Sequence, residues 1–243
     1  MTGAIKALIF DKDGTLFDFE ATWCAWSRGL LLDLAEGDAA HAARMGAAVG
    51  YVFDPAGGPG RFERTSPVIA GTADGVARLL LPHLPGMDAA GLIARMNARA
   101  SAAPQAEVVP LGPLLARLRG RGLRLGVATN DSEAPARAHL RAVGAETAFD
   151  FIAGADSGYG GKPEAGQLLA FADRFDLDPA QVAMVGDSLH DLAAAQAAGM
   201  RGVGVLSGFA TAGDLAPHAH AVLPHIGALE VWLDAGAPAG VAP

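Results

Sequence analysis

The stretch FDKDGTL at residues 10–16 directly follows a largely apolar run at residues 5–9 that predicts a buried strand. It places Asp11 and Asp13 two residues apart at the end of that strand, where alternate side chains point the same way. Two converging carboxylates repel each other, so the pair implies a compensating cation or a shared proton. Gly14 then ends the strand, and the turn offers backbone N–H groups to an anion. The segment therefore predicts a site for a reaction or for ion binding at the end of this strand.

Two neighbouring carboxylates suffice for both steps in the hydrolysis of a phosphate ester. One carboxylate can attack phosphorus and form an aspartyl phosphate, while the other can pass a proton to the leaving group. Asp11 and Asp13 together could therefore fill both roles.

Two later segments supply groups that can hold phosphoryl oxygens. The apolar run that ends in VATND, residues 127–131, brings Thr129, whose hydroxyl can donate to such an oxygen. The segment GKP, residues 161–163, places Lys162 in a Gly-rich loop before a helical stretch. A cation there is suited to the charge of the nucleophile and of the phosphoryl group.

A fourth segment completes the set. In VAMVGDSLHD, residues 182–191, an apolar strand is again followed by acids, Asp187 and Asp191, and carboxylates suit an octahedral Mg²⁺ site of oxygens and waters. The four motifs, in this order, resemble those of the haloacid dehalogenase-like (HAD) phosphohydrolases, and the resemblance spans nearly the whole chain. It implies Mg²⁺-dependent hydrolysis of a small phosphate monoester through an aspartyl phosphate.

The resemblance also implies roles for single residues. The catalytic residues would be Asp11, Asp13, Thr129 and Lys162. Phosphate would be held by Asp13, Gly14, Thr129, Asn130 and Lys162. Mg²⁺ would be bound by Asp11, the backbone carbonyl of Asp13 and Asp187, with Asp191 either ligating the ion or orienting a water molecule.

The spacing of apolar runs predicts an α/β fold. From about residue 107, short apolar runs alternate with helical stretches, which predicts a doubly wound, Rossmann-like parallel sheet with ligands at the carboxyl ends of its strands. We expect this core to comprise residues 1–17 and 107–234, and the small-residue segment 235–243 to be a flexible tail. Residues 18–106 interrupt the core far beyond an ordinary loop, so we expect an inserted, all-helical cap domain.

The position of the insert resembles that of the cap in phosphoglycolate phosphatases and β-phosphoglucomutases. Trp23 and Trp26 stand at helical spacing on an apolar stripe and are expected in its core rather than as a substrate-stacking pair. Arg64, between predicted cap helices, could touch an anionic substrate, although a solvated loop is the favoured interpretation. Hinges are expected at residues 17–20 and near residues 104–110.

Composition limits the remaining possibilities. A net charge of −8 disfavours a nucleic-acid or membrane-surface partner, and the expected partner is a small phosphorylated metabolite. The single cysteine, Cys24, excludes an internal disulfide, and with no signal-peptide pattern or membrane span we expect a cytoplasmic protein. Either a monomer or a homodimer is compatible with the sequence.

Neighbouring activities differ in single residues. A haloacid dehalogenase attacks carbon without Mg²⁺ and lacks the second aspartate, so Asp13 and Asp187 disfavour it. A phosphonatase would use a cap lysine, but the lysines are Lys6, Lys12 and Lys162. A phosphosugar mutase of the β-phosphoglucomutase type shares the core motifs and remains an alternative, as does a non-catalytic phosphometabolite-binding module. Phosphoglycolate is the substrate that the resemblance favours.

Overall fold

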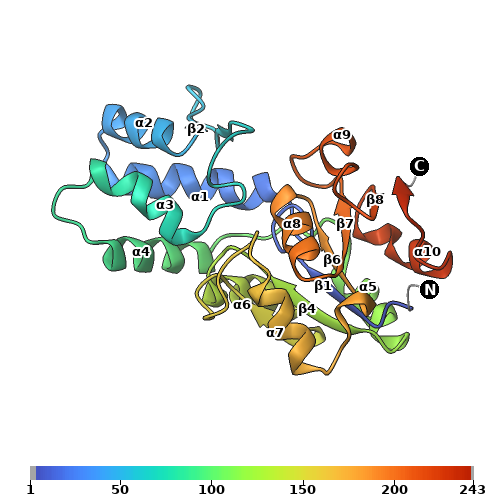
Figure 1. Cartoon of the computed structure of the whole chain (residues 1–243). Helices are drawn as coiled ribbons and strands as arrows, with labels where there is room; N and C mark the ends of the chain where they lie inside the picture. Colours follow the sequence, from blue (N-terminus) through green and yellow to red (C-terminus); the bar gives the residue numbers. More distant parts are fainter. Residues whose placement is uncertain (1–3, 242–243) are drawn as a thin grey trace.

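Short apolar runs form a seven-stranded, all-parallel sheet in the computed structural model, which describes residues 4–241 (Figure 1). In spatial order the strands are β5 (Phe151–Ala153), β4 (Arg124–Ala128), β1 (Ala7–Phe10), β6 (Val182–Gly186), β7 (Arg201–Val205), β8 (Ala221–Leu223) and β9 (Gly240–Val241). The central strands are buried on both faces, which explains why they read as continuous apolar runs. The predicted doubly wound α/β core is confirmed.

Helices cover both faces of the sheet. On one face, α5 (Leu111–Gly120) and α10 (Leu229–Asp234) pack with the even-numbered residues of β1. On the other, α7 (Gly166–Arg174) and α8 (Leu189–Ala197) pack with the odd-numbered ones. The two remaining helices of this part are α6 (Glu133–Ala142) and α9 (Ala212–Leu215). Because alternate strand residues face opposite sides, one short strand contributes to two separate cores.

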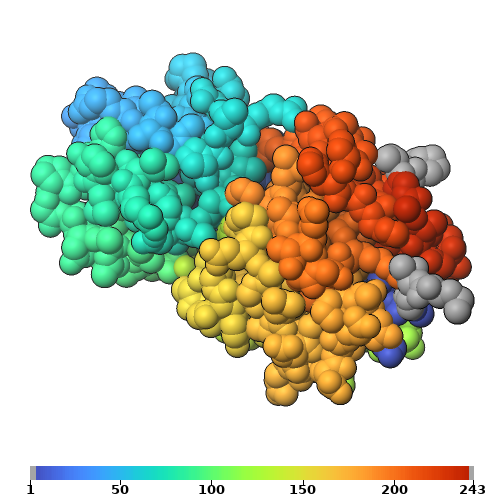
Figure 2. Space-filling view, viewed as in Figure 1, coloured from blue at the N-terminus to red at the C-terminus, as the bar shows by residue number. Residues whose placement is uncertain are grey.

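The segment between β1 and α5 forms a helical lobe beside the sheet (Figures 1 and 2). Its helices are α1 (Phe19–Leu34), α2 (Ala39–Ala48), α3 (Ala73–Leu80) and α4 (Ala89–Ser101). They share a hydrophobic cluster of their own, to which the buried Trp23 and Trp26 belong, as predicted. Asp88 caps α4, since its side chain accepts from the N–H of Gly91.

The expectation of an all-helical insert is wrong at one place. Strands β2 (Tyr51–Val52) and β3 (Arg61–Phe62) pair in an antiparallel ladder. Each strand has two residues, which is too short for the period-2 pattern that identifies a strand in a sequence. Short 3₁₀ turns complete the described secondary structure at Leu81–His83, Glu146–Ala148, Pro179–Gln181 and Ile226–Ala228.

The expected flexible tail is also corrected. Residues 240–241 add β9 to the edge of the sheet beside β8, and the Trp232 indole N–H donates to the Pro238 carbonyl oxygen at 2.9 Å. The segment is poor in apolar side chains, but an edge strand is held by backbone hydrogen bonds, which composition does not reveal. Residues 242–243 lie outside the described part of the chain.

Candidate active site

Three adjacent strands in the middle of the sheet end at the same level. In the parallel ladder, Phe10 of β1 pairs with both Val127 of β4 and Val185 of β6. The polar residues that follow these strands are Asp11, Thr129 and Asp187. Carboxyl ends of parallel strands form one crevice, so motifs separated by more than 100 residues meet there.

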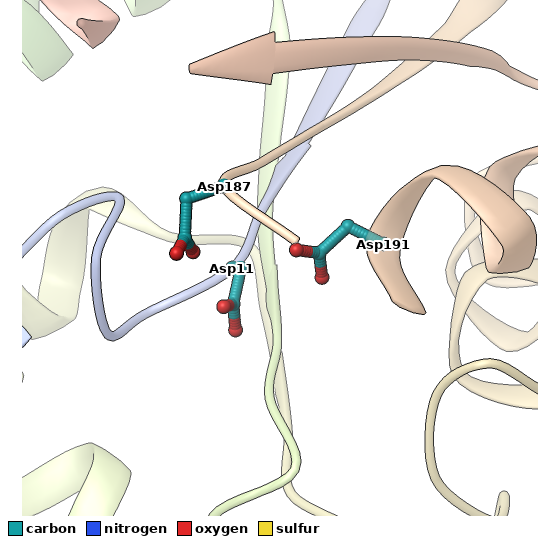
Figure 3. Close-up of side chains that lie close together, drawn as sticks. All are labelled: Asp11, Asp187 and Asp191. Atoms are coloured by element: carbon teal, nitrogen blue, oxygen red, sulfur yellow. The ribbon is translucent and has the colours of Figure 1, made fainter. Parts of the chain in front are cut away.

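Asp187 and Asp191 join Asp11 in a small volume (Figure 3). One carboxylate oxygen of each lies within 4.8 Å of the other two. Burial raises the pKa of Asp11 to about 7, against the opposing effect of Lys162. Burial, reinforced by Asp11 and Asp191, also raises the pKa of Asp187. A divalent cation bound by these oxygens would relieve the repulsion, so the residues present fit such a group.

Lys162 brings the cation that the sequence predicted. Its side chain is nearly inaccessible, and Nζ lies 2.7 Å from Asp11 Oδ1 and 2.6 Å from Asp191 Oδ1. Burial lowers the pKa of Lys162, but the two carboxylates outweigh burial and raise it. The ammonium group therefore stays charged at neutral pH beside Asp11.

Asp191 is a fully buried part of the helix start at α8. Its Oδ2 accepts from the N–H of Ser188 at 3.0 Å and from Ser188 Oγ at 2.7 Å, forming a capping box. Its Oδ1 receives the ammonium of Lys162. Because both oxygens have donors within the protein, these contacts favour an orienting role for Asp191 over direct metal ligation.

Lys12 is a functional candidate that sequence reasoning missed. This lysine is completely buried, with Nζ 2.6 Å from Asp13 Oδ2 and 3.4 Å from Asp131 Oδ2. Burial lowers the pKa of Lys12, while Asp13 and Asp131 outweigh it and raise that pKa. Burial raises the pKa of Asp131 to about 6, against the effect of Lys12. The lysine between the two motif acids thus holds Asp13 in place; its position in DKD was the only sequence signal.

His139 of α6 extends this cluster to the helical lobe. Its Nδ1 lies 3.0 Å from Lys12 Nζ, and its Nε2 lies 2.7 Å from the Ala100 carbonyl oxygen at the end of α4. Lysine can only donate, so we assign the ring as the neutral tautomer that accepts at Nδ1 and donates from Nε2. Burial and the charge of Lys12 lower the pKa of His139 to about 4, in keeping with that form.

The Thr129 side chain can still donate a hydrogen bond, whereas the Asn130 side chain has already used its hydrogen-bonding groups. Thr129 is buried, and its Oγ1 accepts from the N–H of Asp131 at 3.1 Å, so the hydroxyl proton can still be donated. The Asn130 side chain is fully used: it donates to the carbonyls of Ala70 and Lys162 and accepts from the Lys162 N–H, each at 2.8 Å. Phosphate contact by Asn130 would therefore use its backbone N–H.

The prediction for Gly14 is corrected. Its N–H, expected to face an anion, donates to the Phe17 carbonyl oxygen at 2.7 Å and closes the turn. Glycine is required for another reason, because φ is +77° and a Cβ would lie 2.5 Å from Asp187 Oδ2. Gly208 approaches the same carboxylate, with a hypothetical Cβ only 1.8 Å from that oxygen. Two glycines, one missed from sequence, thus make room for Asp187.

A cavity lies between these residues and the helical lobe. Six of its lining residues come from the strand ends and the lysine loop: Asp11, Asp13, Thr129, Asn130, Asp131 and Lys162. The lobe contributes segment 68–73, whose Ala70 carbonyl accepts from Asn130 and lies 3.2 Å from His190 Nδ1. Arg64 lies elsewhere: its side chain is 64% exposed and donates to the Phe209 carbonyl oxygen at 2.8 Å.

The parallel sheet and its acidic crevice define a doubly wound α/β protein with a polar site at the strand ends. A family model of haloacid dehalogenase-like hydrolases matches residues 5–199, and the chain belongs to this family. No helix within residues 4–241 has the length and apolar character needed to cross a bilayer.

Particular relatives share parts of the sequence. "Probable phosphatase IndB" of Dickeya dadantii is 43% identical over 101 residues, which are 42% of this chain and 44% of that protein. A phosphoglycolate phosphatase of Rhodospirillum rubrum is 37% identical over 127 residues, which are 52% of this chain and 53% of that protein. The chain thus spans about half the length of the curated relatives it matches.

The fold is shared over a longer stretch. The crystal structure of a predicted phosphoglycolate phosphatase from Haemophilus somnus has a TM-score of 0.71, with 93% of this chain and 97% of that chain covered. The sequences are 18% identical, so this similarity concerns the fold alone.

Proposed function

We propose that this protein is a Mg²⁺-dependent phosphatase that hydrolyses a small phosphate monoester through an aspartyl phosphate on Asp11. The observation that carries the proposal is the placement of Asp11 within 2.7 Å of the Lys162 ammonium and beside two further buried carboxylates. A carboxylate with raised pKa, a fixed cation and a neighbouring acid are what nucleophilic attack on phosphorus needs. Relatives named as phosphatases support the same activity.

The metal would be held by Asp11, Asp187 and the backbone carbonyl of Asp13, with Asp191 orienting Lys162 and a water molecule. When bound, Mg²⁺ would neutralise charge on the phosphoryl group and on the crowded carboxylates. The raised pKa values of Asp11 and Asp187 are physical support, because a cation would bring both back to the ionised form.

In the first step, a carboxylate oxygen of Asp11 attacks phosphorus in line with the leaving oxygen. The new O–P bond forms as the P–O bond to the leaving group breaks, and Asp13 gives its proton to the departing oxygen. Lys12, 2.6 Å from Asp13 Oδ2, and His139 beyond it keep that carboxyl group oriented.

In the second step, Asp13 takes a proton from a water molecule that attacks phosphorus. The bond from phosphorus to the Asp11 oxygen breaks, which releases inorganic phosphate and restores Asp11 as a carboxylate. Throughout, the equatorial oxygens would be held by Lys162, the Thr129 hydroxyl and the backbone N–H groups of Asp13 and Asn130.

We further propose that residues 18–106 act as a cap that closes over the site. The chain leaves and re-enters the core through two segments that lie side by side: the Asp18 N–H donates to the Ala106 carbonyl at 2.8 Å, and the Val108 N–H to the Leu16 carbonyl at 3.0 Å. Two adjacent connectors can serve as a hinge. Segment 68–73 would reach the site only in the closed arrangement.

We also propose that the protein is located in the cytoplasm. The one cysteine, Cys24, is buried and unpaired, and thiols stay reduced in that compartment.

The test is release of inorganic phosphate from a panel of phosphorylated metabolites, with Mg²⁺ and with a chelator. Wild type should release phosphate only with Mg²⁺, Asp11→Asn should release none, and the control Asp173→Asn, on the surface of α7, should behave like wild type. Turnover retained by folded Asp11→Asn would contradict the covalent route. A new phosphorylated isomer without free phosphate would instead indicate a mutase.

A further inference from the structure

The cavity over Asp11 has two ends of different chemistry. The core end is polar, as described above. The walls on the side of the helical lobe are mostly apolar: Phe19, Trp23, Trp26, Ile69, Val76 and Met96 line them, together with the polar side chains of Thr72 and Asn97. A phosphoryl group held at Asp11 and Lys162 lies at the polar end. The leaving group of the ester must therefore face the apolar walls.

Two basic side chains occur among the described residues that line the cavity, Lys162 and His190, and Nδ1 of the His190 ring already lies 3.2 Å from the Ala70 carbonyl oxygen. Lys162 is the only lysine or arginine among them. Its ammonium is already shared by Asp11 and Asp191 and is assigned to the phosphoryl group. A carboxylate on the leaving group would be removed from water without a countercharge, which is strongly unfavourable.

Lys12 does not supply the missing charge. Its Nζ lies 5.3 Å from the centre of the Trp23 ring, close to the apolar walls. Its Nζ lies 2.6 Å from Asp13 Oδ2 and 3.4 Å from Asp131 Oδ2, so its charge is already taken up by these two groups. Both acids also line the cavity, and the carboxylate of Asp131 would repel an anionic leaving group.

Trp23 and Trp26 add hydrogen-bond donors that have no partner. The side chains are 7% and 8% exposed, and their rings meet edge to face with centroids 4.9 Å apart. Within the described residues, neither buried indole N–H has an acceptor. Buried indole N–H groups are normally paired. Both residues line the cavity, and a shift of the rings toward the free space would let a ligand atom accept from them.

The free space limits the size of the leaving group. The cavity volume is about 60 Å³, which is room for a few water molecules. In this arrangement of core and lobe, the free space suits a compact leaving group of several heavy atoms.

We propose that the substrate is the phosphate ester of a small, uncharged alcohol with an apolar body and a neutral acceptor such as a carbonyl oxygen. Phosphoglycolate, whose leaving group carries a carboxylate, is accordingly a poor substrate. The inference rests on the proposed function for its phosphate end, while the preference for a neutral leaving group rests on the lobe side of the cavity.

A matched pair of compounds tests this preference directly. Acetol phosphate differs from 2-phosphoglycolate by a methyl group in place of the carboxylate oxygen. Each compound is titrated against the full-length Asp11→Asn protein, with the fluorescence of Trp23 and Trp26 as the signal, and each is assayed for phosphate release with wild type. Acetol phosphate should bind at least about tenfold more tightly and be hydrolysed with a correspondingly higher kcat/KM.

An engineered cation should reverse the preference. Asn97 lines the cavity on α4 and is only partly buried. Asn97→Arg should improve phosphoglycolate relative to acetol phosphate by about tenfold, whereas Asn97→Gln should keep the wild-type ratio. The donors are tested by Trp26→Phe, which should weaken acetol phosphate by about three- to tenfold. Binding of ethyl phosphate, which has no such acceptor, should not change.

The outcomes separate the two proposals. Equal or tighter binding of phosphoglycolate, or no binding of either compound, overturns the inference about the leaving group. If Asp11→Asn prefers acetol phosphate but wild type releases no phosphate from any ester, the inference about the pocket stands and the phosphatase proposal fails.

Discussion

The two ends of the cavity differ in how completely their polar groups are paired. At the core end, the ammonium groups of Lys12 and Lys162 are held by carboxylates at 2.6 to 3.4 Å. At the lobe end, the walls are mostly apolar and the indole N–H groups of Trp23 and Trp26 have no acceptor within the described chain. The charged groups at the core end are therefore already fixed by contacts within the protein. The two indole N–H groups at the lobe end have no such contact with the described residues.

The largest expected effect comes from removing the charge at the core end. Lys162→Met leaves Asp11 and Asp191 without their shared cation and takes a donor from the phosphoryl oxygens. We expect kcat to fall by about 10²- to 10³-fold. Phosphate-release kinetics check this, with the exposed Lys6→Met as the control. A kcat near that of wild type would show that the charge of Lys162 is not needed for the reaction.

Crowding Asp187 should have a smaller effect. In Gly208→Ala the new methyl group would lie 1.8 Å from Asp187 Oδ2, so the carboxylate must move. Asp187 is a proposed metal ligand, and disturbing the groups that position a ligand costs about 10- to 100-fold in metal affinity or activity. We expect a higher Mg²⁺ concentration for half-maximal rate. The control is Gly213→Ala, where the nearest atom to a Cβ is 3.7 Å away, and equal Mg²⁺ curves for both variants would refute the crowding argument.

The free energy of unfolding should depend on pH through His139, which contacts both the core and the helical lobe. Its pKa is about 4 in the folded protein, below its ordinary value of 6.5. Between these values the unfolded state binds more protons, so this residue lowers stability as pH falls from 6.5 to 4. From pH 7 to pH 5, wild type should lose about 2 kcal/mol more than His139→Gln.

Urea unfolding at the two pH values measures that difference. The crowded carboxylates titrate in both proteins and therefore cancel from the comparison. Parallel pH profiles for wild type and His139→Gln would mean that the histidine is not held neutral between Lys12 and Ala100.

The smallest effect is expected outside the cavity. Arg64→Ala removes a hydrogen bond to Phe209 and an exposed ion pair with Asp214. Such surface contacts contribute about 0.5 kcal/mol, so we expect a small change in unfolding free energy and an unchanged KM for the best substrate. A clear rise in KM would bring this arginine back as a substrate contact and weaken the account of an uncharged lobe end.

Part of the core end of the site could be predicted from the sequence. Asp11, Thr129 and Asp187 could be placed in one crevice because each follows an apolar strand, and parallel strands end together. Lys162 could be added because its motif lies between theirs in order.

Other features depend on contacts between distant residues. Lys12 meets a histidine 127 positions away, and Asn130 meets a carbonyl 60 positions away. No local pattern encodes such pairs. Trp23 and Trp26 were correctly predicted as core, but helical spacing does not say that their stripe also faces a cavity. The short strands β2, β3 and β9 fall below the length at which periodicity is visible.

The central claim is a covalent intermediate on Asp11, and chemical trapping tests it most directly. Wild type is mixed with Mg²⁺ and its best ester, quenched with borohydride and digested for peptide mass spectrometry, because borohydride reduces an aspartyl phosphate to homoserine. Homoserine is expected at position 11 only when substrate is present. No homoserine at position 11 during active turnover, or homoserine at position 13 instead, would contradict the account.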